Sequence, residues 1–211
     1  MSPAWKALLV LAAYALGSVP FGLVLTRLFT GQDVRAVGSG NIGASNVARA
    51  AGKKLGVLTL VLDAAKASLP MLFTRWLLAG EGPATAERWM IAVGLAAFIG
   101  HLYPVWLRFK GGKGVATALG VFVVLAPVPS VLALATFGAA YGATRVPAVG
   151  SLSGTSVCCL GAIVQTMLER GGVGAGFASP VPWAALFVTF VIFLRHRANI
   201  ARLLQGAENK V

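Results

Sequence analysis

The chain has 211 residues, of which 57% are hydrophobic and only 11% are charged, and its formal net charge is +12. Soluble domains carry about 25% charged residues, so this chain has too few to cover its surface in water. The composition excludes a disordered polar chain and a typical soluble enzyme. It predicts an all-α, polytopic membrane protein.

Seven membrane spans are expected, in chain order, at 7–26, 55–74, 89–107, 115–126, 130–144, 146–168 and within 178–197. The fourth and fifth come from one uncharged stretch, 114–144. As a single helix it would extend roughly 46 Å, well beyond a ~30 Å hydrocarbon core. Pro127 and Pro129 lie near its middle, and two prolines are expected to interrupt a helix there.

The basic residues favour one orientation of these spans. Most of the 18 Lys and Arg residues fall on one side, and only Lys6, Arg75, Arg88 and Arg170 fall on the other. The positive-inside rule then places the N-terminus outside and the C-terminus in the cytoplasm. We expect residues 1–211 to form one integral-membrane domain.

Asp63 and Lys66 interrupt the second apolar stretch. They are three residues apart and share one face of a helix. Because an isolated charge in lipid is costly, they are expected to form a structural ion pair inside the bundle. The spacing also leaves open a role in a proton or ion path.

The first informative loop, 38–49, contains three glycines, two serines, two asparagines and Arg49. Glycines let main-chain N–H groups approach an anion, and a guanidinium suits phosphate. Ser45 and Arg49 have an i, i+4 spacing, so both face one way if a helix begins there. The alternative is a flexible loop followed by a capped helix.

A second loop, 109–117, sets Lys110 and Lys113 among three glycines, just before an apolar helix. A helix N-terminus favours an anion, and Lys113 would stand beside it. The loop is not a Walker A motif, because glycine follows Lys113 where serine or threonine is needed. A basic turn that only sets topology is the alternative.

The third cluster follows the last span. His196 and Asn199 share a helix face, with Arg202 one turn further. Such a basic tail can also simply contact anionic lipid headgroups. All three clusters fall on the same predicted face of the membrane, which favours one anion-binding site.

At these residues the sequence resembles the bacterial acyl-phosphate:glycerol-3-phosphate acyltransferases. The matching motifs are GSGNIGASN-x-x-R at 38–49, GHLYPVWLRFKGGKGVAT at 100–117 and RHRANIARLLQGAE at 195–208. The resemblance implies a seven-span enzyme of the bacterial inner membrane with its active site on the cytoplasmic face. It implies transfer of a long acyl chain from acyl phosphate to the 1-hydroxyl of glycerol 3-phosphate, giving 1-acylglycerol 3-phosphate (lysophosphatidic acid) and inorganic phosphate. No cofactor and no obligate protein partner are implied; membrane lipid is.

The resemblance also implies site residues. The implied substrate or phosphate contacts are Ser39, Asn41, Ser45, Asn46 and Arg49 in the first loop and Lys113, Ser151 and Asn199 in the other segments. The implied catalytic residues are Arg49, Lys113, His196 and Asn199. Two positions depart from the family pattern: Ile42 stands where proline is frequent, and Ser45 replaces threonine but keeps the hydroxyl.

The expected chemistry needs no nucleophilic residue, because acyl phosphate is an activated mixed anhydride. Arg49 and Lys113 are expected to hold phosphates while asparagines and loop N–H groups stabilise the oxyanion. Either His196 or a substrate phosphate is the base for the attacking hydroxyl. Acidic residues are scarce in the loops, so no metal is expected.

Three other classes of protein fit less well. An organic-anion transporter predicts internal repeats and polar residues at mid-membrane, whereas this chain shows no repeat and its polar motifs lie in loops at one face. A nucleic-acid binder is suggested by the net charge alone, without interleaved aromatic residues. An acyl-CoA-dependent acyltransferase of the His-x4-Asp type fails, because Trp106 follows His101 at that spacing and Ala201 follows His196.

Overall fold

A computed structural model of the protein describes residues 2–208, and every regular element within them is a helix. The all-α expectation is confirmed. The chain divides into two compact units at the junction of Val124 and Leu125, and each unit is described by itself. The expectation of a single domain stays a prediction.

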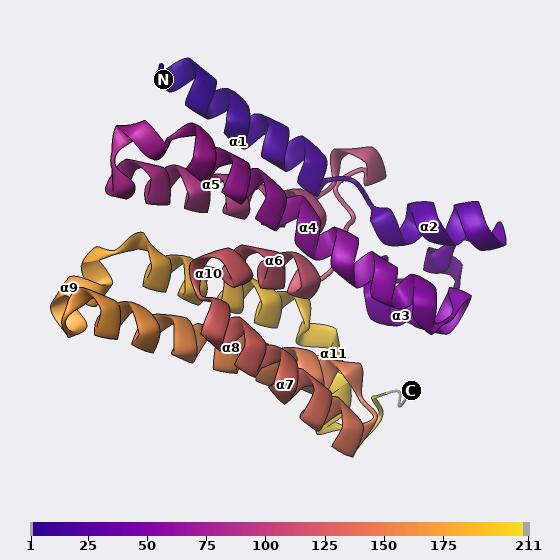
Figure 1. Ribbon diagram of the computed structural model, residues 1–211. Coiled ribbons are helices and arrows are strands. Elements are labelled where there is room, and N and C mark those ends of the chain that lie inside the picture. Colours follow the sequence, from indigo (N-terminus) through magenta and orange to yellow (C-terminus); the bar gives the residue numbers. More distant parts are fainter. Residues whose placement is uncertain (1, 209–211) are drawn as a thin grey trace. The chain divides into compact units, whose positions relative to one another are not determined.

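The first unit runs through nine helices, of which the last ends at the unit boundary (Figure 1). They are α1 (Pro3–Gly17), α2 (Phe21–Thr30), η1 (Val34–Ala36), α3 (Ala44–Ala51), α4 (Lys53–Leu77), η2 (Ala79–Glu81), α5 (Pro83–Leu102), η3 (Val105–Leu107) and α6 (Val115–Leu125).

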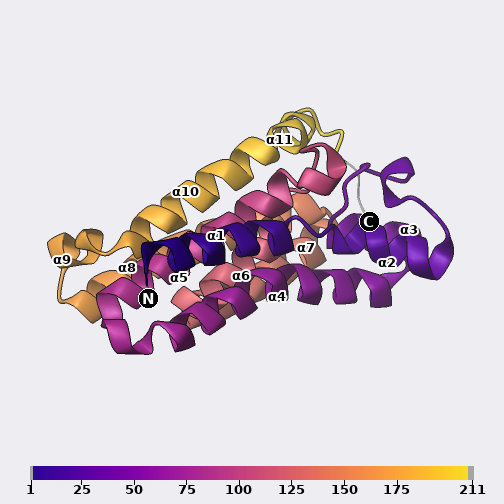
Figure 2. The ribbon, with the colours of Figure 1, turned by 90° about the horizontal axis from the view of Figure 1, so that it is seen from above.

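Within this unit, α1, α4 and α5 pack side by side, and α2 and α3 lie together at one end of α4 (Figures 1 and 2). The approach of α1 to α5 depends on Gly17, where a Cβ atom would lie only 2.5 Å from Ala97 Cα. Phe98 and Leu102, on α5, are completely buried in the core of the unit.

The first predicted span is broken. Instead of one helix over 7–26, α1 ends at Gly17 and α2 begins at Phe21. Pro20 lies in the break, where its missing N–H would interrupt the hydrogen-bond ladder of a continuous helix. The interruption puts the main-chain carbonyl of Val19 within reach of a side chain from α4, a contact that the site uses.

The second unit contains α7 (Pro127–Thr144), α8 (Pro147–Arg170), α9 (Val173–Ala178), α10 (Pro180–Arg195) and α11 (Arg197–Leu204). The break expected inside 114–144 is present: α6 ends at Leu125, and Pro127 is the first residue of α7. Both α7 and α10 pack on α8 (Figure 1). At Gly150 a Cβ atom would lie 2.9 Å from the carbonyl oxygen of Phe137, so α8 needs glycine there.

Among residues 2–208, four segments are long and apolar enough to cross a membrane: Pro3–Thr30, Lys53–Leu77, Pro83–Leu107 and Pro147–Arg170. The bent pair α10 and α11, whose two helices meet at 60°, adds a fifth if it is counted as one span. Helix α6 is apolar but shorter. The count of seven and the orientation of the termini therefore stay predictions.

Candidate active site

Asn46 organises the first loop from its centre. Its side-chain amide Nδ2 donates to the carbonyl oxygens of Val34, Val37 and Asn41, each at 2.9 Å. Its Oδ1 accepts from the N–H of Ser39 at 3.1 Å. The side chain is buried, and these contacts tie η1, the loop and the first turn of α3 together. The role of Asn46 as a substrate contact stays a prediction, and its observed partners are main-chain groups of the loop itself.

Arg49 lies across this loop from the last turn of α3. A Cβ atom on Gly38 would stand 3.7 Å from Arg49 Nη1 and 2.5 Å from Asn46 Oδ1. Gly38 also has a φ of +56°, which favours glycine. The guanidinium therefore lies close to Gly38, and the next residue, Ser39, is exposed. A cation beside a bent, glycine-rich main chain is an arrangement suited to an anion.

Several N–H groups of the loop are already used. The N–H of Ser39 is bonded to Asn46, that of Gly40 to the Val37 carbonyl, and that of Gly43 to Asn41 Oδ1 at 2.8 Å. These three N–H groups already have acceptors inside the loop. The expected stabilisation of an oxyanion would therefore fall to other N–H groups of the loop. Ser45, on the first turn of α3, is exposed, and its predicted role is not tested.

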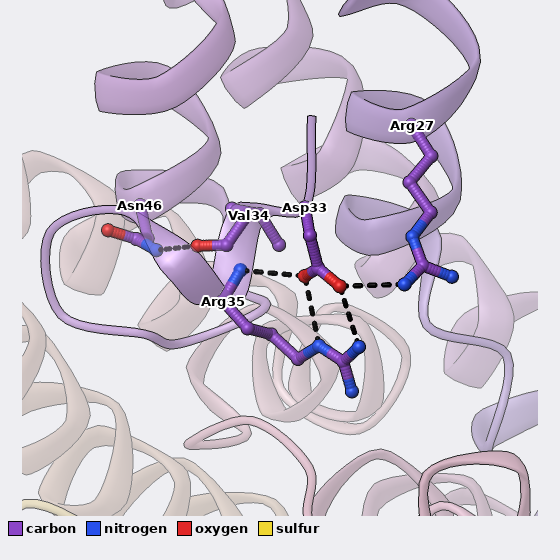
Figure 3. Close-up of polar contacts among 5 residues, drawn as sticks. All are labelled: Arg27, Asp33, Val34, Arg35 and Asn46. Carbon is purple, nitrogen blue, oxygen red and sulfur yellow. Dashed lines mark hydrogen bonds and ion pairs between the residues drawn. The ribbon is translucent and has the colours of Figure 1, made fainter. Parts of the chain in front are cut away.

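An ion-pair bridge fixes the entry to the loop (Figure 3). Asp33 Oδ2 lies 2.6 Å from both Arg27 Nη2 and Arg35 Nη2, and Asp33 Oδ1 also accepts from the N–H of Arg35 at 3.0 Å. Hydrogen bonds from Arg35, together with the bond from Arg27, hold the pKa of Asp33 well below its usual value. The carboxylate therefore stays charged and joins α2 to η1. Nothing in the sequence reasoning identified Asp33.

An apolar floor supports the same loop. Leu23, Val34, Ile42 and Val47 are buried together, and Leu55 of α4 packs against them. Ile42, which departs from the family pattern, is thus a packing residue on the inner side of the loop. Burial of these side chains sets the distance of the loop from α4.

The second loop lies on the end of α5. The N–H of Gly111 donates to the carbonyl of Leu102, and that of Gly112 donates to the carbonyl of His101, both at 3.1 Å. Lys113 is half-buried and follows Gly112 directly, two residues before α6 begins. The structure therefore places Lys113 next to the start of α6, where the sequence predicted it.

Beneath this loop, Asp63 and Lys66 form the expected ion pair, with Lys66 Nζ 2.7 Å from Asp63 Oδ1. Lys66 Nζ also lies 3.0 Å from the carbonyl of Val19, at the break between α1 and α2. His101 joins the pair, with its Nδ1 2.9 Å from Lys66 Nζ. Sequence reasoning missed this third member, because it lies on α5, far from the pair along the chain.

The tail residues belong to the second unit. His196 is buried at the end of α10, and its Nδ1 lies 2.8 Å from the carbonyl oxygen of Ile192. Since a carbonyl only accepts, Nδ1 carries the proton, which in the neutral ring leaves the lone pair on Nε2. Ser151, in the second turn of α8, is also buried.

Glu208 connects two further tail residues. Asn199 Nδ2 donates to Glu208 Oε1, and Arg202 Nε donates to Glu208 Oε2, both at 2.7 Å. Glu208 closes the third motif, but it was not predicted to act. Its side chain is 8% exposed, whereas that of Arg202 is 41% exposed, so the carboxylate is sheltered from water but this partner is not.

The structure thus brings the first-loop residues together around Asn46, and it gathers His101 with Asp63 and Lys66 in the first unit. Ser151, His196 and Asn199 belong to the second unit, with Glu208. Among residues 2–208, no three His, Cys, Asp or Glu side chains are grouped so that they could hold a metal ion. The expectation of a metal-independent reaction stays a prediction.

Comparison with known proteins identifies the family. The family model described as glycerol-3-phosphate acyltransferase matches residues 7–206, which is nearly the whole chain. The chain belongs to the glycerol-3-phosphate acyltransferase family. The resemblance inferred from the three motifs is confirmed.

Relatives agree along their full length. The acyltransferase of this name from Anaeromyxobacter dehalogenans (strain 2CP-C) is 58% identical over 205 residues, covering 97% of this chain and 96% of its own. That from Myxococcus xanthus (strain DK1622) is 44% identical over 203 residues, covering 96% and 97%.

Solved structures show the same architecture. PlsY (YgiH), an integral membrane glycerol 3-phosphate acyltransferase in its glycerol 3-phosphate form, superposes with a TM-score of 0.83 at 37% identity, covering 98% of this chain and 95% of its own. Its lysophosphatidic acid form gives 0.80 at 36% identity, covering 97% and 94%. This acyltransferase is therefore an integral membrane enzyme of the PlsY kind, and phospholipid biosynthesis fits its family.

Proposed function

We propose that this enzyme transfers a long acyl chain from acyl phosphate to the 1-hydroxyl of glycerol 3-phosphate, releasing 1-acylglycerol 3-phosphate and inorganic phosphate. The observation that carries the proposal is the first loop, where the Arg49 side chain lies close to Gly38. The loop motif belongs to a family whose relative PlsY was solved in glycerol 3-phosphate and lysophosphatidic acid forms.

The proposed step is a direct displacement. The 1-hydroxyl oxygen attacks the acyl carbonyl carbon, and the bond from that carbon to the phosphate oxygen breaks. Phosphate leaves with the electron pair, and the hydroxyl proton passes to a base. A mixed anhydride has a good leaving group, so positioning and charge stabilisation are sufficient catalysis.

Each predicted site residue has a role in this step. Arg49 and Lys113 hold the phosphate groups. Ser39, Asn41, Ser45, Asn46 and Ser151 bind substrate directly or through the loop main chain, and Asn199 completes the set. A guanidinium can bind phosphate oxygens in pairs, whereas an ammonium acts as a point charge.

The base is either His196 or a substrate phosphate. The bond from His196 Nδ1 to Ile192 supports the first choice, because it fixes the tautomer in which Nε2 is the basic nitrogen. The variants His196→Asn and His196→Gln separate the two by their profile of kcat against pH. A base role predicts a large loss of kcat and loss of the lower pH limb; near-full activity would leave the proton to phosphate.

The donor is tested with purified protein in detergent or lipid. Glycerol 3-phosphate is supplied with either palmitoyl phosphate or palmitoyl-CoA, and 1-acylglycerol 3-phosphate is measured. We expect product from acyl phosphate alone, with activity unchanged by strong chelation. Transfer from acyl-CoA at a comparable rate would contradict the proposed donor.

We further propose seven spans in the bacterial inner membrane, with the N-terminus outside and the substrate loops in the cytoplasm. The 13 basic residues on one predicted side support this orientation. A C-terminal tag should be accessible to protease only from the cytoplasmic face. Accessibility only from the outer face would overturn the orientation.

A further inference from the structure

A buried polar cluster lies directly beneath the second loop, and the proposed chemical step does not use it. It consists of Asp63 and Lys66 on α4 and His101 on α5. Their side chains are 2%, 1% and 4% exposed. His101 Nδ1 lies 2.9 Å from Lys66 Nζ and 3.6 Å from Asp63 Oδ1.

The contact between Lys66 and His101 fixes where one proton lies. Two protonated groups cannot face each other at this distance, and lysine is the stronger base. Its ammonium group only donates, so His101 Nδ1 accepts and the ring proton lies on Nε2. The Asp63–Lys66 pair therefore holds the imidazole in one tautomer and one orientation.

The opposite edge of that ring supports Gly112. A Cβ atom on Gly112 would lie 2.1 Å from His101 Nε2, and one on Gly111 would lie 2.2 Å from the His101 carbonyl oxygen. Both glycines also donate main-chain hydrogen bonds to the end of α5. The loop thus rests on the imidazole and the adjoining main chain, with no room for a side chain between them.

Lys113 lies between two such close contacts. Gly112 rests on His101, and Gly114, at φ +88°, would place a Cβ atom 2.4 Å from Phe98 Cε2. The main chain on both sides of Lys113 is therefore fixed by side chains of α5. A change in the ring beneath Gly112 removes the side-chain support on one side of Lys113.

Stability alone does not explain why charges are buried here. Two ions lose their hydration on burial, and an apolar pair of equal volume is often at least as stable. An apolar pair could not hold the His101 imidazole in one orientation and one tautomer.

We propose that His101, oriented by the Asp63–Lys66 pair, is a positioning residue that sets the location of Lys113 for binding a substrate phosphate. This inference rests on the proposed function, in which Lys113 holds a phosphate. His101 itself touches no reacting atom. Its effect is transmitted through Gly112 to the neighbouring lysine.

A double-mutant cycle tests the transmission. His101→Ala, Lys113→Ala and the double variant are compared with the unmodified enzyme for kcat and for KM of each substrate. We expect His101→Ala to raise, by roughly tenfold, the KM of whichever substrate Lys113→Ala affects, with a smaller change in kcat. In the Lys113→Ala background the same change should cost less than about twofold. Equal losses in both backgrounds would overturn the proposal.

The conservative variant His101→Asn keeps an acceptor for Lys66 but lacks the far edge of the ring. If His101→Ala fails to fold, His101→Asn should still fold, and it should raise the same KM. A loss of kcat alone, with both KM values unchanged, would contradict a positioning role.

A binding readout separates this inference from the proposed function. The thermal midpoint of each variant is measured with and without glycerol 3-phosphate, and with inorganic phosphate as a second probe. The increase in thermal midpoint on adding the ligand should be smaller in His101→Ala and in Lys113→Ala than in the unmodified enzyme. In the double variant the two decreases should not add. If the unmodified enzyme makes no product from acyl phosphate, the proposed function fails. If it does, and the shifts add, only the positioning role fails.

Discussion

The side-chain amide of Asn46 donates to the main-chain carbonyl of Val34 at 2.9 Å, across a separation of 12 residues. Three carbonyls converge on that one amide nitrogen, and the amide oxygen accepts from Ser39. A single carboxamide thus replaces the regular secondary structure that this segment lacks.

Asn46→Asp should disrupt the first loop. An ionised aspartate cannot donate, so it would leave the carbonyls of Val34, Val37 and Asn41 facing a negative charge. Each buried group left unpaired costs about 1–3 kcal/mol. We expect a lower thermal midpoint and a loss of kcat/KM of roughly tenfold or more. The matched variant Ser45→Ala, at an exposed position on α3, should leave the midpoint unchanged; an unchanged midpoint in Asn46→Asp would instead favour a substrate contact alone.

Arg49→Lys keeps the charge but loses the planar two-pronged donor. If the Arg49 guanidinium binds two oxygens of one phosphate, Arg49→Lys should raise the KM for that substrate by roughly tenfold or more. Arg49→Ala should raise the same KM further. Steady-state kinetics with each substrate varied in turn make the comparison. Arg88→Lys, an exposed position on α5, is the control and should behave as the unmodified enzyme. Equal kinetics for Arg49→Lys and the unmodified enzyme would show that only the charge matters.

Glu208→Gln should loosen the tail. The two carboxylate oxygens of Glu208 accept from Asn199 and Arg202. In glutamine one of these oxygens becomes an NH2 group, which would face the N–H donor of Asn199 or of Arg202. Hydrogen bonds to charged groups contribute about 1.5–3 kcal/mol. The expected result is a fall in activity with a lower thermal midpoint, and Arg202→Ala should show a smaller fall because Asn199 keeps its partner. A fall in Arg202→Ala as large as in Glu208→Gln would show that the ion pair, not Asn199, is what Glu208 serves.

Asp33 gives a prediction about pH. Its pKa is lowered in the folded protein, so its contribution to stability is complete above the usual value of about 3.9 and is lost as the pH falls through the lower folded value. Because Asp33 is 28% exposed and its arginine partners are more exposed still, the contribution should be no more than about 1 kcal/mol. Asp33→Asn should therefore lower the unfolding midpoint by a constant small amount between about pH 5 and 8, and by less at more acidic pH.

The control for this experiment is Glu169→Gln, on the exposed end of α8. A difference between Asp33→Asn and the unmodified enzyme that grew as the pH fell would contradict the assignment.

Much of the fold could be predicted from the sequence, because hydropathy and prolines are local signals. The interruption at Pro127 is one example, and the Asp63–Lys66 pair follows from helical spacing. The break at Pro20 was missed because the apolar run 7–26 has the length of a single span, so its length gave no reason to divide it. Hydropathy indicates how readily a segment enters lipid, and it carries no information on the main-chain hydrogen bonds that proline removes.

The candidate site was also only partly predictable from the sequence. Motif positions indicated Arg49 and Lys113, but they could not show what holds each residue in place. His101 is 35 residues from Lys66, and Asp33 lies outside the motifs altogether. Such partners are set by tertiary packing, for which a single sequence has no periodic signal.

Direct transfer of the acyl chain is the central claim, and a quenched time course tests it most directly. Inorganic phosphate and 1-acylglycerol 3-phosphate are measured together after the enzyme is mixed with palmitoyl phosphate and glycerol 3-phosphate. We predict that the two products appear together in equal amounts, and that omitting glycerol 3-phosphate stops phosphate release. A burst of phosphate that precedes the acylated product would reveal an acyl-enzyme and contradict the claim.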